Sequence, residues 1–131
     1  MPEVRVVRAG ERATALPATP GMHREVAFEH DGVWAGTVTT DAGLLTGWHV
    51  HPGHDTYIYV ESGEAVVEYG PGGSLADDAG PGDFVHIPRG IVHREGTTAG
   101  SGGVRAVLVR VGEGPIIENR EGPDPEVANH G

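Results

Sequence analysis

Short alternating segments separated by glycine- and proline-rich turns are the feature that most restricts how this chain can fold. Apolar residues recur at every second position in five stretches, as expected for half-buried strands. These stretches cover residues 33–39, 56–60, 64–69, 83–87 and 104–111. The segments between them are turn sequences, and the chain contains 22 glycines and 10 prolines among 131 residues. The pattern predicts an all-β protein, a sandwich or small barrel of antiparallel strands.

The length suits one domain, with a barrel core predicted over about residues 26–111. The ends, residues 1–25 and 112–131, have little periodicity and are predicted to be N- and C-terminal arms. Strand edges of a small β protein need cover, and such arms often provide it across a subunit interface. We therefore expect a homodimer.

Charge and hydropathy exclude several partners. A net charge of −10 would repel phosphates, which argues against nucleic acid and against anionic membranes. No apolar run approaches the roughly 20 residues of a membrane span, and the N-terminus lacks the apolar region of a signal peptide. A cytoplasmic location is expected. The chain has no cysteine, so a metal site built on thiolates is excluded.

Residues 49–55, "HVHPGHD", bring three histidines and an aspartate together. Because alternate residues of a strand share a face, His49 and His51 project together. Such a pair can supply two imidazole ligands to one ion. The proline and glycine that follow bend the chain, which could bring Asp55 or His54 round to the same point.

A second element, "GDFVHIPRGIVH" at residues 82–93, ends in a histidine at the start of another strand. The chain here resembles the cupin superfamily, whose motifs are G(X)5HXH(X)3–4E(X)6G and G(X)5PXG(X)2H(X)3N. The matching positions are Gly43, His49, His51 and Gly63 in the first motif and Gly82, Pro88, Gly90 and His93 in the second. The resemblance implies a double-stranded β-helix, or jelly-roll barrel, in which His49, His51 and His93 bind a metal.

Two motif positions depart from the family pattern. The motif glutamate falls on Thr56 when counted back from Gly63, and on Asp55 when counted forward from His51. The final asparagine falls on Thr97. The fourth ligand is therefore open between Asp55, which we favour, His54, and a water molecule with Thr56 nearby.

Other polar residues are candidates for the pocket. Tyr57 and Tyr59 share the parity of Asp55, so they are expected to point into the barrel with it, where a phenol can act as an acid. His86 is a third candidate: it either lines the pocket or sits on the outer face of the sheet. Arg105 and Arg110 have opposite parity in the last stretch, so at most one of them faces the interior.

The resemblance implies a mononuclear metal enzyme acting on a small organic substrate, with a dioxygenase-like oxidoreductase as first choice. The alternatives are a metal-dependent isomerase or lyase and a non-catalytic cupin that binds or senses a small ligand. One divalent ion per chain is expected. The donor set suits Fe, Mn, Ni, Co, Cu or Zn and does not choose among them.

Overall fold

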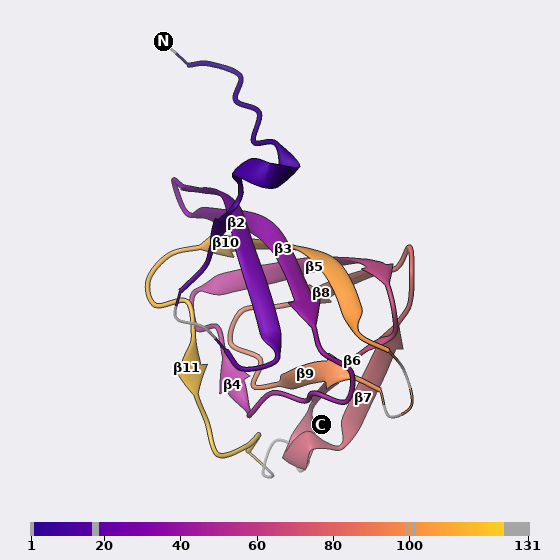
Figure 1. Cartoon of the computed structure of the whole chain (residues 1–131). Coiled ribbons are helices and arrows are strands. Elements are labelled where there is room, and N and C mark those ends of the chain that lie inside the picture. The colour runs from indigo at the N-terminus through magenta and orange to yellow at the C-terminus, as the bar shows by residue number, and fades with distance from the viewer. Residues whose placement is uncertain (1, 17–18, 99, 101, 125–131) are drawn as a thin grey trace.

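A computed structural model describes residues 2–16, 19–98, 100 and 102–124 of the chain. Within these residues the chain forms eleven strands and two short 3-10 helices, η1 (Ala9–Glu11) and η2 (Pro71–Gly73). Figure 1 shows how the labelled strands are arranged. The strands are β1 (Ala13–Thr14), β2 (Met22–His30), β3 (Val33–Thr40), β4 (His49–Val50), β5 (His54–Ser62), β6 (Ala65–Tyr69), β7 (Leu75–Ala79), β8 (Phe84–Ile87), β9 (Arg94–Thr97), β10 (Val104–Gly112) and β11 (Glu118–Asn119). No helix among the described residues is long and apolar enough to cross a membrane.

The strands form two antiparallel layers. The first layer has the order β1-β2-β3-β10-β5-β8. The second consists of β7-β6-β9 and β11-β4, which backbone hydrogen bonds between the β4 and β9 regions join into one layer. His49 N donates to His93 O, and His93 N donates to His49 O, each at 2.9 Å. The arrangement is the double-stranded β-helix that the sequence predicted, with the two layers facing each other in Figure 1.

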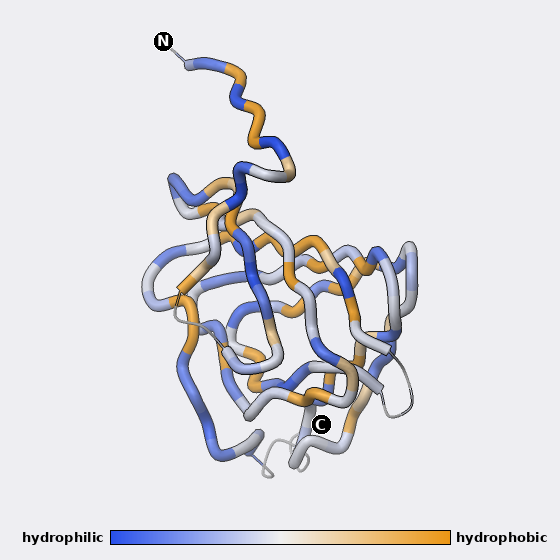
Figure 2. Tube along the Cα trace, in the orientation of Figure 1, coloured by the Kyte–Doolittle hydropathy of each residue, from blue (hydrophilic) through white to orange (hydrophobic). Residues whose placement is uncertain are grey.

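The core lies between the layers, and strand alternation creates it. Every second side chain of β3, β5 and β10 is buried, among them Trp34, Ile58, Val60 and Leu108. Figure 2 shows the same alternation as short apolar and polar segments along the strands. Burying one such aliphatic or aromatic side chain stabilises the fold by about 1.5–3 kcal/mol, which is why these strands keep one fixed register.

Each of the five strands predicted from alternation is present, as β3, β5, β6, β8 and β10. Two longer strands were not predicted. β2 carries half-buried polar residues on both faces, and β7, "LADDA", is an edge strand exposed at all positions but Ala79. Neither strand buries a continuous row of apolar side chains, so neither shows the alternation of apolar and polar residues from which strands were predicted.

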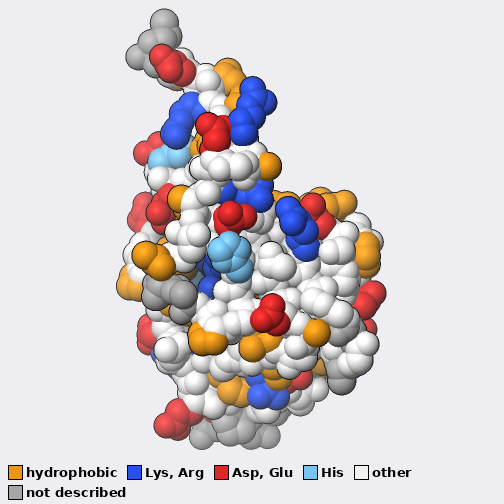
Figure 3. Space-filling model, viewed as in Figure 1, with side chains coloured by type: hydrophobic (Ala, Val, Ile, Leu, Met, Phe, Trp, Pro, Cys, Tyr) orange, Lys and Arg blue, Asp and Glu red, His pale blue; other side chains and the backbone are white. Residues whose placement is uncertain are grey.

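Both predicted arms contribute to the sheets. β1 and the start of β2 precede residue 26, and β11 follows residue 111 and pairs with β4. Residues 125–131 of the predicted C-terminal arm lie outside the described part of the chain. Residues 2–8 extend away from the body of the molecule (Figure 1), and Figure 3 shows acidic and basic side chains side by side on this arm and at its root.

One glycine permits the approach that positions the histidines. A Cβ atom on Gly96 of β9 would lie 1.9 Å from the Leu44 carbonyl oxygen, so only glycine lets the two segments pack this closely. The neighbouring hydrogen bond from Thr97 N to Leu44 O, 2.9 Å long, fixes the register. As a result, β9 lies directly beside the segment that carries His49.

Candidate metal centre

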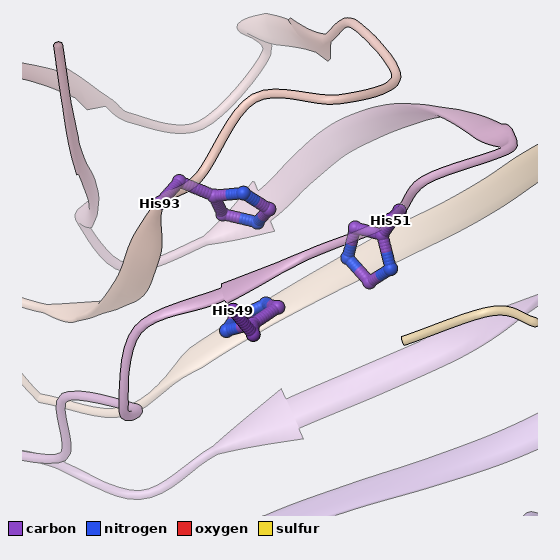
Figure 4. A group of neighbouring side chains, drawn as sticks. All are labelled: His49, His51 and His93. Atoms are coloured by element: carbon purple, nitrogen blue, oxygen red, sulfur yellow. The ribbon is translucent and has the colours of Figure 1, made fainter. Parts of the chain in front are cut away.

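Three histidines from the second layer meet in the interior. His49 lies on β4, His51 directly follows that strand, and His93 directly precedes β9 (Figure 4). Their relative exposures are 5%, 2% and 0%, and one nitrogen of each lies within 4.8 Å of the other two. Nitrogens bound at about 2.1 Å to one ion lie at most about 4.2 Å apart. The spacing of the three rings is therefore close to that of ligands sharing one ion.

Backbone carbonyls fix the orientation of all three rings. His49 Nδ1 lies 2.9 Å from Gly47 O, His93 Nδ1 lies 2.9 Å from Ile91 O, and His51 Nδ1 lies 2.5 Å from Ile116 O. A carbonyl only accepts, so each Nδ1 carries the hydrogen and each Nε2 presents a lone pair. Nε2 of His51 and of His93 is buried without a hydrogen-bond partner among the described residues. Buried lone pairs that converge without a donor fit a metal ion, and the carbonyls hold the ligating tautomer.

Burial keeps the imidazoles of His51 and His93 neutral, as ligation requires. Desolvation and, after it, the positive charge of Arg110 lower the pKa of His51 to about 4. The pKa of His93 is also lowered by burial, although the charge of Glu95 opposes the shift. Both rings are therefore unprotonated at neutral pH.

Glu95 is a fourth residue of the centre that the sequence analysis missed. Its Oε1 lies 3.6 Å from His49 Nε2 and 4.0 Å from His93 Nε2, and its side chain is 17% exposed. Burial favours the neutral acid, but the adjacent His49 and His93 side chains and the positive charge of Arg110 outweigh it and lower the pKa of Glu95 to about 2. The sequence spacing could have predicted its position: Glu95 lies two residues after His93, and residues two apart on a strand share a face, as His49 and His51 do.

The inward position expected for Asp55 is wrong. On β5 the buried positions are His54, Thr56, Ile58 and Val60, so Asp55 faces outward. Its carboxylate accepts hydrogen bonds from Arg89 Nε at 3.0 Å, Arg89 Nη2 at 2.8 Å and His86 Nε2 at 3.2 Å. The apolar residues Ile58 and Val60 of β5 face the core. Residues at alternate positions from them therefore face inward as well, and Asp55, at an intervening position, faces outward.

His54 and Thr56, the other two candidates for the fourth position, do face inward. His54 is 6% exposed and lines a cavity with Trp34 and Ile116, and Thr56 is 2% exposed. His54 Nδ1 and Thr56 Oγ1 are buried without a hydrogen-bond partner among the described residues. The cluster of ligand nitrogens within 4.8 Å of one another contains His49, His51 and His93 but not His54.

The inward positions expected for Tyr57 and Tyr59 are also wrong, and His86 takes the outer of the two positions open to it. Tyr57 is 45% exposed and stacks on the His86 ring, with centroids 4.6 Å apart and planes 5° apart. Tyr59 is 37% exposed and lies against Phe84. These residues occupy the outward positions of β5 and β8, so they form an aromatic surface outside the barrel.

Of the two arginines of β10, Arg110 is the one that faces inward. Its exposure is 7%, whereas Arg105 lies outside and pairs with Glu61, Nε to Oε1, at 3.5 Å. Desolvation lowers the pKa of Arg110 to about 10, with the charge of Arg24 acting in the same direction and that of Glu95 against it. Arg110 remains a cation at neutral pH.

Fold and site together define a cupin. The family model described as "Cupin domain" matches residues 36–110, which is more than half of the chain. The protein belongs to this family. Comparison with curated protein sequences gave no match.

Solved structures with the same fold include three with named proteins. KdgF from Halomonas sp. is 20% identical with a TM-score of 0.69, covering 84% of this chain and 96% of that one. The DMSP lyase DddQ from Ruegeria pomeroyi DSS-3 is 27% identical with a TM-score of 0.57, covering 69% and 44%. A mutant of the oxalate decarboxylase OxdC from Bacillus subtilis is 16% identical with a TM-score of 0.65, covering 78% and 29%. The similarity supports the fold, and enzymes are among the proteins that share it.

Proposed function

We propose that this protein is a metal-dependent cupin enzyme that holds one divalent ion through His49, His51 and His93 and acts on a small organic molecule. The observation that carries the proposal is the set of three Nε2 lone pairs directed into one buried space. Each ring is held by a carbonyl at its other nitrogen. An ion bound there would supply Lewis-acid chemistry and, if it is redox-active, electron transfer.

Glu95 is proposed as the fourth ligand in place of the absent motif glutamate. With the hydrogen of each ring on Nδ1, neither His49 Nε2 nor His93 Nε2 offers a proton to the carboxylate 3.6 and 4.0 Å away. A cation among these atoms would satisfy all three. A protonated His49 paired with Glu95 is the alternative without an ion, and metal analysis distinguishes the two.

The donor set of three imidazoles and a carboxylate suits several divalent ions. Among the solved structures of the same fold, one of Bacillus subtilis oxalate decarboxylase is described as containing Mn(II) centres, which makes manganese an ion to test early. Iron, nickel, cobalt, copper and zinc remain candidates.

Two reaction classes are proposed for testing. The dioxygenase-type oxidation implied by the motif resemblance remains the first. A lyase or decarboxylase reaction is the second, because two of the named proteins of the same fold are a DMSP lyase and an oxalate decarboxylase. A cupin that only binds a small ligand is the non-catalytic alternative. A cytoplasmic location remains a prediction.

Element analysis of the purified protein tests the metal site. We expect about one ion per chain in the wild type and in His86→Ala, an exposed histidine on the outer face, and loss of the ion in His49→Ala and His93→Ala. Circular dichroism checks that the variants remain folded. Equal metal content in all four proteins would refute the site.

Turnover assays test the reaction class. Oxygen uptake with catechols, flavonols and 1,3-diketones would support the oxidation, and product formation without oxygen consumption from small carboxylic acids would support the lyase or decarboxylase. Metal-loaded protein that binds such molecules without converting any of them would support the binding alternative.

A further inference from the structure

A cavity of about 360 Å³ adjoins the metal centre. It is large enough for a small organic molecule. His51 lies in its wall, together with Arg24 of β2 and Arg110 of β10. The same two arginines also border a smaller interior space that Glu95 lines. They therefore lie between the cavity and this smaller space.

The guanidinium of Arg110 is buried and makes few contacts that compensate its charge among the described residues. The residue is 7% exposed, and its Nε has no hydrogen-bond partner among the described residues. The Trp34 ring, 5.6 Å from the guanidinium carbon, offers a weak cation–π contact. The negative charge of Glu95 acts on Arg110 through space. Burying a charge in this way is unfavourable unless a partner of opposite sign arrives.

Arg24 makes the positive charge of this wall larger. Its Nη1 donates to Thr19 Oγ1 at 3.1 Å, and its Nη2 lies 3.6 Å from Met22 Sδ. Both contacts are neutral, so they orient the guanidinium without compensating its charge. Arg24 also repels Arg110 electrostatically. The cavity wall thus holds two neighbouring cations and one carboxylate residue, the exposed Glu29. In a chain whose net charge is −10, this local excess of positive charge is an arrangement that an anion would stabilise.

We propose that Arg110 and Arg24 form a subsite for a carboxylate group of the substrate, so that the molecule processed at the centre is a small organic acid. The proposal rests on the proposed function for the role of the metal. A guanidinium matches a carboxylate through two parallel N–H···O bonds, and Thr19 adds a hydroxyl beside Arg24. Ala15, Val26, Trp34, Ile116 and Ile117 in the cavity wall suit an apolar remainder.

Calorimetric titration with acids and their neutral amides tests this subsite. The probes are acetate, malonate and benzoate, each with its amide, and inorganic phosphate. We expect at least one carboxylate to bind the wild type at least about 10-fold more tightly than its amide and than phosphate. Arg110→Met and Arg24→Gln should each weaken that binding by about 10- to 100-fold, whereas Arg105→Met, a matched change outside the barrel, should leave it unchanged.

Arg24→Gln keeps the test valid if Arg110→Met does not fold, because Arg24 is half-buried and not part of the core. The subsite would be overturned if acids and amides bind equally, if phosphate binds most tightly, or if no acid binds. Equal effects of Arg24→Gln and Arg105→Met would also overturn it.

The same titrations on chelator-treated protein separate this inference from the proposed function. If the arginines hold the carboxylate, the preference for acid over amide persists after the metal is removed. If the preference for acid over amide is lost on chelation, the carboxylate binds to the metal and not to the arginines, and the subsite is overturned. Protein that purifies without metal but prefers the acid would refute the metal centre and leave the subsite in place.

Discussion

At the scale of single residues, the carboxylate of Asp55 illustrates what a strand position does to a side chain. It accepts hydrogen bonds from Arg89 and His86 on the outer face, while its neighbours His54 and Thr56 are buried. Hydrogen bonds from the Arg89 side chain, then from His86 and the Arg89 backbone, lower the pKa of Asp55 from 3.8 to about 2. The residue that was favoured as a metal ligand is thus an ion-pair partner.

Asp55→Asn is predicted to leave the metal content unchanged, whereas Glu95→Gln lowers metal affinity by at least about 10-fold. Element analysis and metal titration of the two isosteric variants provide the comparison. Loss of the ion from Asp55→Asn with retention in Glu95→Gln would reverse the assignment of the fourth ligand.

The ion pair of Asp55 also predicts a pH dependence. A carboxylate whose pKa is lowered on folding stabilises the protein above the unfolded value of 3.8, and this contribution is lost as pH falls toward about 2. The difference in unfolding free energy between wild type and Asp55→Asn should therefore shrink between pH 5 and pH 3. Urea denaturation at the two pH values measures it. A difference that grows toward low pH would contradict the lowered pKa.

At the scale of secondary-structure elements, the segment from Glu113 to Arg120 connects the C-terminal part of the chain to the centre. β11 pairs with β4 through Glu118 opposite Val50 and Asn119 opposite His49, and Ile116 O accepts the hydrogen of His51 Nδ1. A short strand far along the sequence thus orients one ligand and lines the cavity beside it.

Deleting residues 114–131 is predicted to lower metal affinity by about 10- to 100-fold, because His51 loses the acceptor that orients its ring. The core strands should keep their circular dichroism spectrum, since Glu113 lies beyond the end of β10. Metal titration measures the effect. Ile116→Ala, which retains the carbonyl, serves as control and should change the affinity less. Unchanged affinity in the truncated protein would show that the carbonyl is dispensable.

At the scale of the whole molecule, apolar side chains remain on the surface of the isolated chain. Val4 and Val6 of the N-terminal arm are 96% and 60% exposed, and Phe84 on the edge strand β8 is 79% exposed. The arm extends away from the sandwich in Figure 1. Exposed apolar groups of this kind are commonly covered by a partner, and the homodimer expected from the sequence remains a prediction.

Sedimentation velocity should give a mass of two 13.7 kDa chains for the full-length protein. Deletion of residues 2–8 is predicted to shift the equilibrium toward the monomer, because the arm would no longer cover the partner's surface. A protein that remains monomeric at about 100 µM, or a dimer unaffected by the deletion, would contradict the prediction.

The sequence was most informative where its pattern was local. Alternation gave β3, β5, β6, β8 and β10, because burial of one face requires an apolar residue at every second position. It did not give β2 or β7, which lack a clean apolar face. The matched cupin family agrees with the motif spacing around His49, His51 and His93.

Strand alternation by itself determined the fold class, since it depends on neighbours a few residues apart. The resemblance of two local motifs to the cupin family implied which three histidines converge. The tertiary structure decided the rest. The parity of β5 turned Asp55, Tyr57 and Tyr59 outward, and β9 brought Glu95 against His49. The sheet order β2-β3-β10 placed the buried Arg110 near Arg24. These outcomes depend on contacts between distant segments, and only the packing of the two layers specifies them.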